Sequence, residues 1–286
     1  FFLCIGGVMS RTLEAYRTLY PSDFYERYLK EQIRPDGREV LGTRAVNIST
    51  GSIGTAYGSS MIKIGSTAVV AGVQAELAFE DLSIPSQLIV NIEVGGICGT
   101  NFSGKPSEST QALSSRLNSL IKSCNLVRNL DELYVESEDK GTKVLWYLFV
   151  DLYCLDHDGN IFDACLLALI AALKNVRLPQ GEIINGQVMG TKDRPIQLEI
   201  APDYPLSLSF CSFQDYVLAD PTHEEEDLAD SYVSVICSAN NPGKLWGIFK
   251  QGGTCISPDK LKECISRTID HTQALVSQIE GALEAN

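Results

Sequence analysis

The most apolar part of the chain lies at residues 144–175 and contains two elements with different patterns. Residues 144–155 are nearly all apolar and rich in Val, Trp, Tyr and Phe, which predicts a strand buried on both faces. Residues 157–160 (His-Asp-Gly-Asn) then supply turn chemistry, and Asp163 is placed to cap the helix that follows. That helix, residues 164–173, is apolar all round and must lie inside the molecule. A buried strand that leads into a buried helix predicts the centre of a layered α/β or α+β domain.

Shorter patterns flank this centre. Before it, apolar spacing and turn residues predict a helix over 10–32 with a break at Pro21, a turn at 34–37, a glycine-rich loop at 95–106, a helix over 107–124, and strands at 46–49, 61–64, 68–73 and 88–94. After it they predict a loop or loose hairpin at 179–195, a helix from Ser257 to about 282, and strands at 206–213, 216–218, 232–238 and 245–249.

This order predicts a single domain over residues 10–286 with two similar halves, about 10–130 and 131–286. No proline- or serine-rich linker separates the halves. Residues 1–9 are expected to be upstream residues with Met9 as the start, because the apolar lead FFLCIGGV lacks a basic segment and is too short for a membrane span.

Composition narrows the function classes. A net charge of −13 and a pI near 4.7 argue against a stand-alone nucleic-acid binder, although partners could supply the cations of an RNA channel. The nine cysteines show no C-x-x-C pair and no spacing suited to zinc, which indicates a reducing compartment. We therefore expect no metal and no cofactor.

Several acidic residues are candidates for chemistry, each with a structural alternative. Asp151 in the middle of the predicted strand is either an acid/base or metal group, or a core residue bonded to backbone or to an arginine. The aspartates that surround the 157–160 turn, Asp156, Asp158 and Asp163, could bind a hard cation, but turn and cap roles explain them with fewer assumptions.

The acidic run at residues 220–227 could also hold a cation. However, Thr222 and Glu225 have capping-box spacing, and acids in a first helical turn suit the helix dipole. The three histidines lie far apart in the sequence, and no Ser or Cys stands in a nucleophile motif. The residues by themselves therefore indicate an α+β protein without a convincing catalytic set.

Three strings in a fixed order carry a family resemblance. Residues 34–38 read Arg-Pro-Asp-Gly-Arg, residues 151–164 place four aspartates around a Gly-Asn turn, and Asp220-Pro221-Thr222 precedes three glutamates. Together they closely resemble the RNase PH-like subunits of the RNA exosome, in the non-catalytic branch, over residues 10–279. The resemblance implies an α+β RNase PH fold, with a duplicated β/α unit akin to domain 2 of ribosomal protein S5.

The resemblance also implies partners and a process. Such subunits form a hexameric ring with five related subunits, carry a cap of S1 or KH proteins, and thread single-stranded RNA to a separate nuclease. The ring serves 3′-to-5′ RNA processing and degradation, including rRNA maturation and mRNA decay, in nucleus, nucleolus and cytoplasm. The resemblance implies no cofactor and no association with a membrane.

Loss of phosphorolysis is a further expectation from the resemblance. Active relatives place arginines in the loop before the first long helix, a Ser/Thr-Arg pair ahead of the central strand, and paired aspartates after the central helix. Here residues 100–109 offer only Lys105, residues 141–143 read Gly-Thr-Lys, and residues 179–199 hold Glu182, Asp193 and Glu199 in no matching pattern. Lysine also lacks the planar fork that grips phosphate bidentately. We therefore expect no catalytic residues.

Lys105, Arg116 and Lys143 are the predicted RNA contacts, with ordinary solvated charges as the other interpretation. A hypothesis of another class remains open. In it the chain is a phosphate-dependent 3′-to-5′ exoribonuclease that uses Asp151 or Asp163 together with Lys143.

Overall fold

The structure is a computed structural model that describes residues 14–79, 86–95, 98, 108–129, 134–136, 143–184, 187–241 and 243–284. The helices are α2 (Pro21–Lys30), α3 (Glu108–Cys124), α4 (Ile161–Lys174), α5 (His223–Leu228) and α6 (Pro258–Glu284). The strands are β1 (Val46–Thr50), β2 (Gly58–Ile64), β3 (Thr67–Phe79), β4 (Leu88–Val94), β5 (Tyr134–Glu136), β6 (Lys143–Asp156), β7 (Arg177–Ile184), β8 (Gln187–Gln197), β9 (Pro205–Phe213), β10 (Tyr216–Ala219), β11 (Ser231–Ser238) and β12 (Leu245–Gln251).

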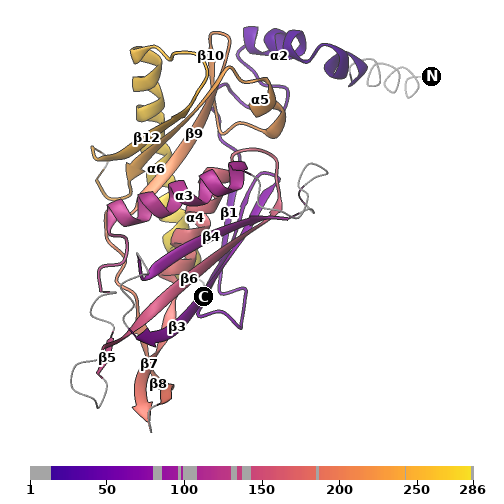
Figure 1. The fold of residues 1–286 in the computed structure, drawn as a ribbon. Helices are drawn as coiled ribbons and strands as arrows, with labels where there is room; N and C mark the ends of the chain where they lie inside the picture. Colours follow the sequence, from indigo (N-terminus) through magenta and orange to yellow (C-terminus); the bar gives the residue numbers. More distant parts are fainter. Residues whose placement is uncertain are drawn as a thin grey trace.

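The first sheet has the strand order β1-β2-β3-β6-β4, and β5 also pairs with β6. Neighbouring strands run antiparallel except β4, which is parallel to β6. The parallel pair needs a crossover, and α3 lies in the connection between its two strands. Figure 1 shows α3 between the lower, purple strands of this sheet and the upper, orange strands of the second sheet.

β6 confirms the predicted central strand, but its burial differs from the prediction along its length. Residues 144–148 are buried on both faces. Beyond them one face opens, so that Tyr153 is 45% and Leu155 41% exposed while Val150, Leu152 and Cys154 stay buried. The reason is that α4 packs on the inner face only, against β2, β3 and β6. The prediction of a strand buried on both faces was wrong for this half.

α4 is the buried helix that its sequence predicts, because every residue from Phe162 to Leu173 is buried. It lies between the sheets and contacts β9 of the second sheet as well as the first. The turn before it uses left-handed backbone at Gly159 (φ 76°) and Asn160 (φ 55°). A Cβ at Gly159 would lie 2.5 Å from the backbone of Thr222, so this position also requires glycine for close approach. Asn160, not Asp163, occupies the N-cap position.

The second sheet has the order β10-β9-β11-β12, and all of its neighbouring strands are antiparallel. Every residue of β9 is buried, and α6 packs on β9 and β11 and reaches β1 of the first sheet. Residues 179–184 and 187–195 lie in the antiparallel strands β7 and β8, so the hairpin alternative is confirmed and the loop alternative is wrong. Figure 1 shows this hairpin projecting beyond the first sheet.

The N-terminal elements follow their local signals. Residues 14–19 are helical, and α2 begins at Pro21, which confirms the break there. The 34–37 turn is closed by the Gly37 amide, which donates to the Arg34 carbonyl at 2.9 Å. Lys260 N donates to Ser257 Oγ at 3.4 Å, as a cap at the start of α6 requires.

The division into two halves near residue 130 stays a prediction. The sheets argue for a later dividing point, because β6 belongs with β1–β4 whereas the second sheet begins at β9. We propose a boundary after α4. Within the described residues, no helix is both long and apolar enough to cross a membrane.

Candidate functional site

The three strings of the family resemblance converge in space at a buried cluster of charged and amide side chains. We call it the buried ion network, and it consists of Arg34, Arg38, Arg44, Asn160, Asp220 and Glu225. It joins the segment before β1, the turn before α4, and the stretch that runs from the end of β10 into α5. Contacts between groups as much as 191 residues apart hold these segments together.

Asp220 is the centre of the network and is 1% exposed. Arg44 grips it bidentately, with Nε donating to Oδ2 at 2.9 Å and Nη2 donating to Oδ1 at 2.8 Å. The Arg44 amide and the Asn160 side chain each add a hydrogen bond of 2.7 Å. Burial alone would raise the pKa of Asp220, but the hydrogen bonds and charge of Arg44 outweigh it and hold the pKa below its usual range.

Arg34 is completely buried, which lowers the pKa of its guanidinium. It donates to the carbonyls of Val40 and Ala219, and its Nη1 lies 3.4 Å from Glu225 Oε2. Glu225 also accepts from the Thr222 amide at 2.9 Å, which confirms the predicted capping box of α5. Removal of one partner from such a set leaves an uncompensated buried charge, so the network acts as a structural clasp.

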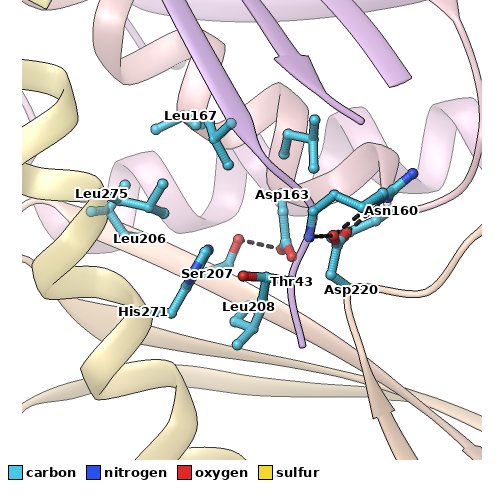
Figure 2. A pocket seen from close by; sticks show the side chains of 13 residues that line it. Thr43, Asn160, Asp163, Leu167, Leu206, Ser207, Leu208, Asp220, His271 and Leu275 are labelled. Atoms are coloured by element: carbon cyan, nitrogen blue, oxygen red, sulfur yellow. Dashed lines mark hydrogen bonds and ion pairs between the residues drawn. The ribbon is translucent and has the colours of Figure 1, made fainter. Parts of the chain in front are cut away.

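Asp163 is buried beside this network and points to β9. It accepts from the Ser207 hydroxyl at 2.5 Å (Figure 2). It also accepts from the Ser209 amide at 2.7 Å. Burial raises the pKa of Asp163 to about 6, although these hydrogen bonds oppose the shift. The adjoining cavity measures about 10 Å³, room for about one water molecule. Asp163 therefore joins α4 to the second sheet, and its predicted role as a helix cap was wrong.

An open cleft lies next to the network, between α3, the start of α4 and β12. We call it the α3 cleft. It has a volume of about 310 Å³ and is lined by Ile92, Val94, Ser109, Thr110, Leu113, Arg116, His157, Ile161, Phe162, Glu226, Tyr232 and Gln251. Its volume falls at the lower end of the range for small-molecule sites. Apolar side chains form much of this lining, so the placement of its few charges decides what it can bind.

Arg116 is the only lysine or arginine among the described residues that line the α3 cleft. Its guanidinium carbon lies 5.3 Å from the centre of the Phe249 ring, a cation–π contact. With the Gln251 amide oriented so that its oxygen faces Arg116, that oxygen accepts from Arg116 Nη1 at 3.1 Å. The guanidinium is therefore held at the wall of the cleft by neighbours on β12.

The N-terminus of α4 opens toward the cleft, but a carboxylate already occupies it. Asn160 N donates to Glu226 Oε1 at 2.7 Å, and burial raises the pKa of Glu226 to about 7. Burial and the nearby His223, whose ring centre is 5.4 Å away, lower the pKa of His157, which is therefore mostly neutral at pH 7. A phosphate at this helix end would meet Glu226 instead of free amides or several cations.

Two of the three predicted RNA contacts are described in the structure, and one of these two lies at the cleft. Arg116 lines it, whereas Lys105 lies outside the described residues. Lys143 begins β6 and stands in register with Glu136, at the opposite end of that strand from His157. At the rise of an extended strand, its backbone is about 40 Å from the cleft end of β6. Within the part of the chain that the structure describes, no group of three or more His, Cys, Asp or Glu side chains could hold a metal ion.

Sequence reasoning missed the roles of two residues and misplaced a third. Arg44 lies between a turn and a strand, and no motif in the neighbouring sequence predicts its contact with Asp220. Glu226 was considered only as part of the acidic run at 220–227, and no role of its own was predicted for it. Its spacing from Thr222 excludes it from the capping box and could have distinguished it from Glu225. Asp151 was expected inside the core and instead lies on the open face of the first sheet, half-buried opposite Gly72. The acids at 182 and 193 lie on the β7–β8 hairpin.

Two family models match the sequence: the 3′ exoribonuclease family (RNase PH) domain 1 over residues 42–179 and domain 2 over residues 203–269. The exosome complex component rrp43 of Schizosaccharomyces pombe is 34% identical over 91% of this chain and 96% of that protein. The chain belongs to the RNase PH family of 3′ exoribonucleases. This membership confirms the resemblance and the α+β RNase PH fold.

Other proteins and solved structures that resemble this RNase PH family member also come from exosomes. An archaeal exosome complex component Rrp42, from Methanothermobacter thermautotrophicus, is 29% identical over 89% of the chain and 91% of that protein. The solved structure of the Archaeoglobus fulgidus exosome with RNA bound to the active site contains a chain with a TM-score of 0.76 and 26% identity, which covers 90% of this chain and 96% of that one. A chain of an archaeal exosome core gives a TM-score of 0.73 and 25% identity, with coverage of 91% and 96%.

Proposed function

We propose that this chain is a non-catalytic structural subunit of the RNase PH-like ring of an RNA exosome. Two findings support the proposal. The exosome components that it resembles are matched along nearly their whole length, and one of them shares 34% of its residues. The second finding, which carries the non-catalytic part, is the charge content of the α3 cleft.

Phosphorolysis needs a cationic site for inorganic phosphate, further cations along the RNA backbone, and an acid for the leaving oxygen. The described lining of the α3 cleft offers one guanidinium, and that group is engaged by Phe249 and Gln251. The α4 N-terminus, a ready anion site by its geometry, already holds Glu226. Among the described residues of the cleft an acid is present with a single guanidinium, so we infer that the subunit is inert.

The subunit would complete a hetero-hexameric ring with other RNase PH-like subunits and offer a surface to S1 and KH cap proteins. Single-stranded RNA would pass through the assembled channel to a separate nuclease, for 3′-to-5′ processing and degradation in nucleus, nucleolus and cytoplasm. We retain Arg116, Lys105 and Lys143 as proposed RNA contacts. Arg116 has the strongest support, because its side chain lines an open cleft.

The alternative is a phosphate-dependent exoribonuclease built on Asp151 or Asp163 with Lys143. No observation favours it. Asp163 is buried against Ser207 and Ser209, while Asp151 lies on the open face of the first sheet. Asp151 and Lys143 are eight positions apart on β6, about 26 Å in an extended strand, so their backbones are far beyond reach of one reacting phosphate.

An assay of the purified chain with single-stranded RNA and inorganic phosphate tests the proposal, with an active RNase PH family enzyme as the positive control. We expect no release of nucleoside diphosphates from the chain alone. We also expect recovery of a ring when the chain is co-expressed with RNase PH-like paralogues from its own source. Nucleoside diphosphate release that Lys143→Ala abolishes would establish the enzyme instead, and failure to form a ring would remove the structural role.

A further inference from the structure

A hollow that is separate from the α3 cleft lies on the open face of the first sheet. It lies between the 53–57 loop and the outward side chains of β3 and β6, and measures about 330 Å³. We call it the outer-sheet hollow. Its lining residues that matter here are Ile53, Tyr57, Gly72, Glu76, Asp151 and Tyr153. No residue of the buried ion network lines it.

The backbone defines the shape of the hollow. Gly72 on β3 stands opposite Asp151 on β6, and the missing side chain leaves space beneath Ile53. A Cβ added at Gly72 would lie 3.7 Å from Ile53 Cδ1, an ordinary van der Waals contact, so the space above Gly72 accepts at least a methyl group. Tyr57 is held in place because its amide donates to Val73 O at 2.9 Å and its carbonyl accepts from Arg177 N at 3.0 Å. The hollow is therefore preformed.

The described lining of the hollow is negatively charged and contains no lysine or arginine. Glu76 and Asp151 line the hollow, and Glu93 on β4 stands in register with Tyr153 at its side. The ion pairs between described residues include none of these three carboxylates. The pKa of the Tyr153 hydroxyl is raised, chiefly by the Glu93 charge, then by burial and by Asp151. A half-buried carboxylate such as Asp151 gains most from a cation that arrives with a partner.

Exposed aromatic and apolar side chains surround these acids. Tyr57 is 39% and Tyr153 45% exposed, and Met61 (37%) and Leu155 (41%) continue the same face. Ring faces attract guanidinium and ammonium groups, and their aliphatic stems pack on apolar surface. A bare metal ion fits less well, since no metal-binding group of three or more His, Cys, Asp or Glu side chains occurs among the residues described. An RNA phosphate would be repelled.

We propose that the outer-sheet hollow docks a basic segment of another protein. An arginine or lysine enters between Tyr57 and Tyr153 with its head group against Asp151, and a second basic residue of the segment faces Glu76, four positions along β3 from Gly72. A neighbouring apolar residue of the segment packs on Met61 and Leu155. The net charge of −13 draws basic partners toward the chain as a whole, and the hollow gives that attraction a specific place. This proposal holds whether or not the chain belongs to a ring.

Fluorescence anisotropy with the full chain tests it. The probe is a labelled peptide with two arginines that flank one leucine, and the matched peptide carries glutamates in place of the arginines. We expect the arginine peptide to bind and the glutamate peptide not to bind. The double variant Asp151→Asn/Glu76→Gln should raise the Kd at least about tenfold. The control Asp215→Asn/Glu263→Gln removes the same charge at exposed positions elsewhere and should change the Kd less than about twofold.

Two further variants distinguish the aromatic ring of Tyr153 from its hydroxyl group and test whether the shape of the hollow matters. Tyr153→Phe keeps the aromatic face and should bind as the wild type does, whereas Gly72→Val fills the floor of the hollow and should weaken binding like the double variant. Urea midpoints establish that each variant is folded, and each comparison is made between folded variants. The proposal is overturned if the wild type does not bind the arginine peptide, if the control variant loses as much affinity as the hollow variant, or if Gly72→Val binds unchanged.

Discussion

The buried ion network and the α3 cleft are neighbours that Asn160 connects: its side chain binds Asp220 of the network, while its backbone amide binds Glu226, which lines the cleft. They handle charge in opposite ways. In the network, three arginines surround Asp220 and Glu225 with little access to solvent. In the cleft, an open volume of about 310 Å³ is lined by one arginine among the described residues. The strings that mark the family therefore supply the clasp of the fold, whereas the described lining of the adjoining cleft carries a single arginine.

Removal of the network's centre gives the largest expected effect. Asp220→Ala leaves Arg44 and Arg38 without their shared carboxylate inside the protein, so we expect the free energy of unfolding to fall by about 3–5 kcal/mol. Urea unfolding followed by circular dichroism measures it. Asp215→Ala is the control, because that side chain is fully exposed, and it should change stability by less than about 0.5 kcal/mol. A loss equally small for Asp220→Ala would mean that the network is not a clasp.

Asp163 gives a second, smaller effect that depends on pH. Its pKa rises from the ordinary value of 3.8 to about 6 in the folded chain, so between about pH 4 and 6 the folded chain keeps a proton that the unfolded chain has released. The free energy of unfolding should therefore fall as pH rises through this window, by about 3 kcal/mol for two pKa units. Glu226, with a pKa raised to about 7, acts in the same direction up to higher pH.

The measurement is the difference between wild type and Asp163→Asn across pH 4–7. Asparagine cannot ionise, so the variant should lack the part of the decline that Asp163 contributes. Asp220 acts with the opposite sign, since its lowered pKa stabilises the fold above the unfolded value and that stability is lost as pH falls. Parallel curves for wild type and variant would show that Asp163 does not titrate in this way.

A substitution in the α3 cleft should have the smallest effect on stability, and it should also reduce RNA contact. Arg116→Ala removes one cation–π contact of about 0.5–1 kcal/mol and one cationic contact for a passing strand. In the assembled ring we expect ultraviolet cross-linking of single-stranded RNA to this subunit to fall a few-fold at low salt and less at high salt. Lys122→Ala is a matched control, because Lys122 is exposed on the same helix but does not line the cleft. Equal losses for both variants would mean that α3 attracts RNA only by general charge.

Much of the local structure was determined by the sequence itself. The predicted strand 88–94 coincides with β4, and the predicted helix 107–124 begins one residue before α3. The break at Pro21, the 34–37 turn and the Thr222–Glu225 capping box also formed as expected. These features depend on apolar periodicity, fixed backbone angles and hydrogen bonds between residues a few positions apart, all of which the local sequence specifies.

Tertiary structure alone decided how the charges are paired and which faces are open. Asp151 sits in an apolar run, yet its face of β6 is open because α4 covers only the other face. Asp163 is in cap position by sequence but is directed to β9, and Arg44 finds Asp220 across 176 positions of chain. Lys143 and Arg116 are both cations near predicted elements, and the length of β6 separates them. Such pairings depend on which distant segments pack together. The spatial surroundings of a carboxylate, and not its neighbours in the sequence, therefore decide whether it stabilises the fold, lines a cleft or lies on an open face.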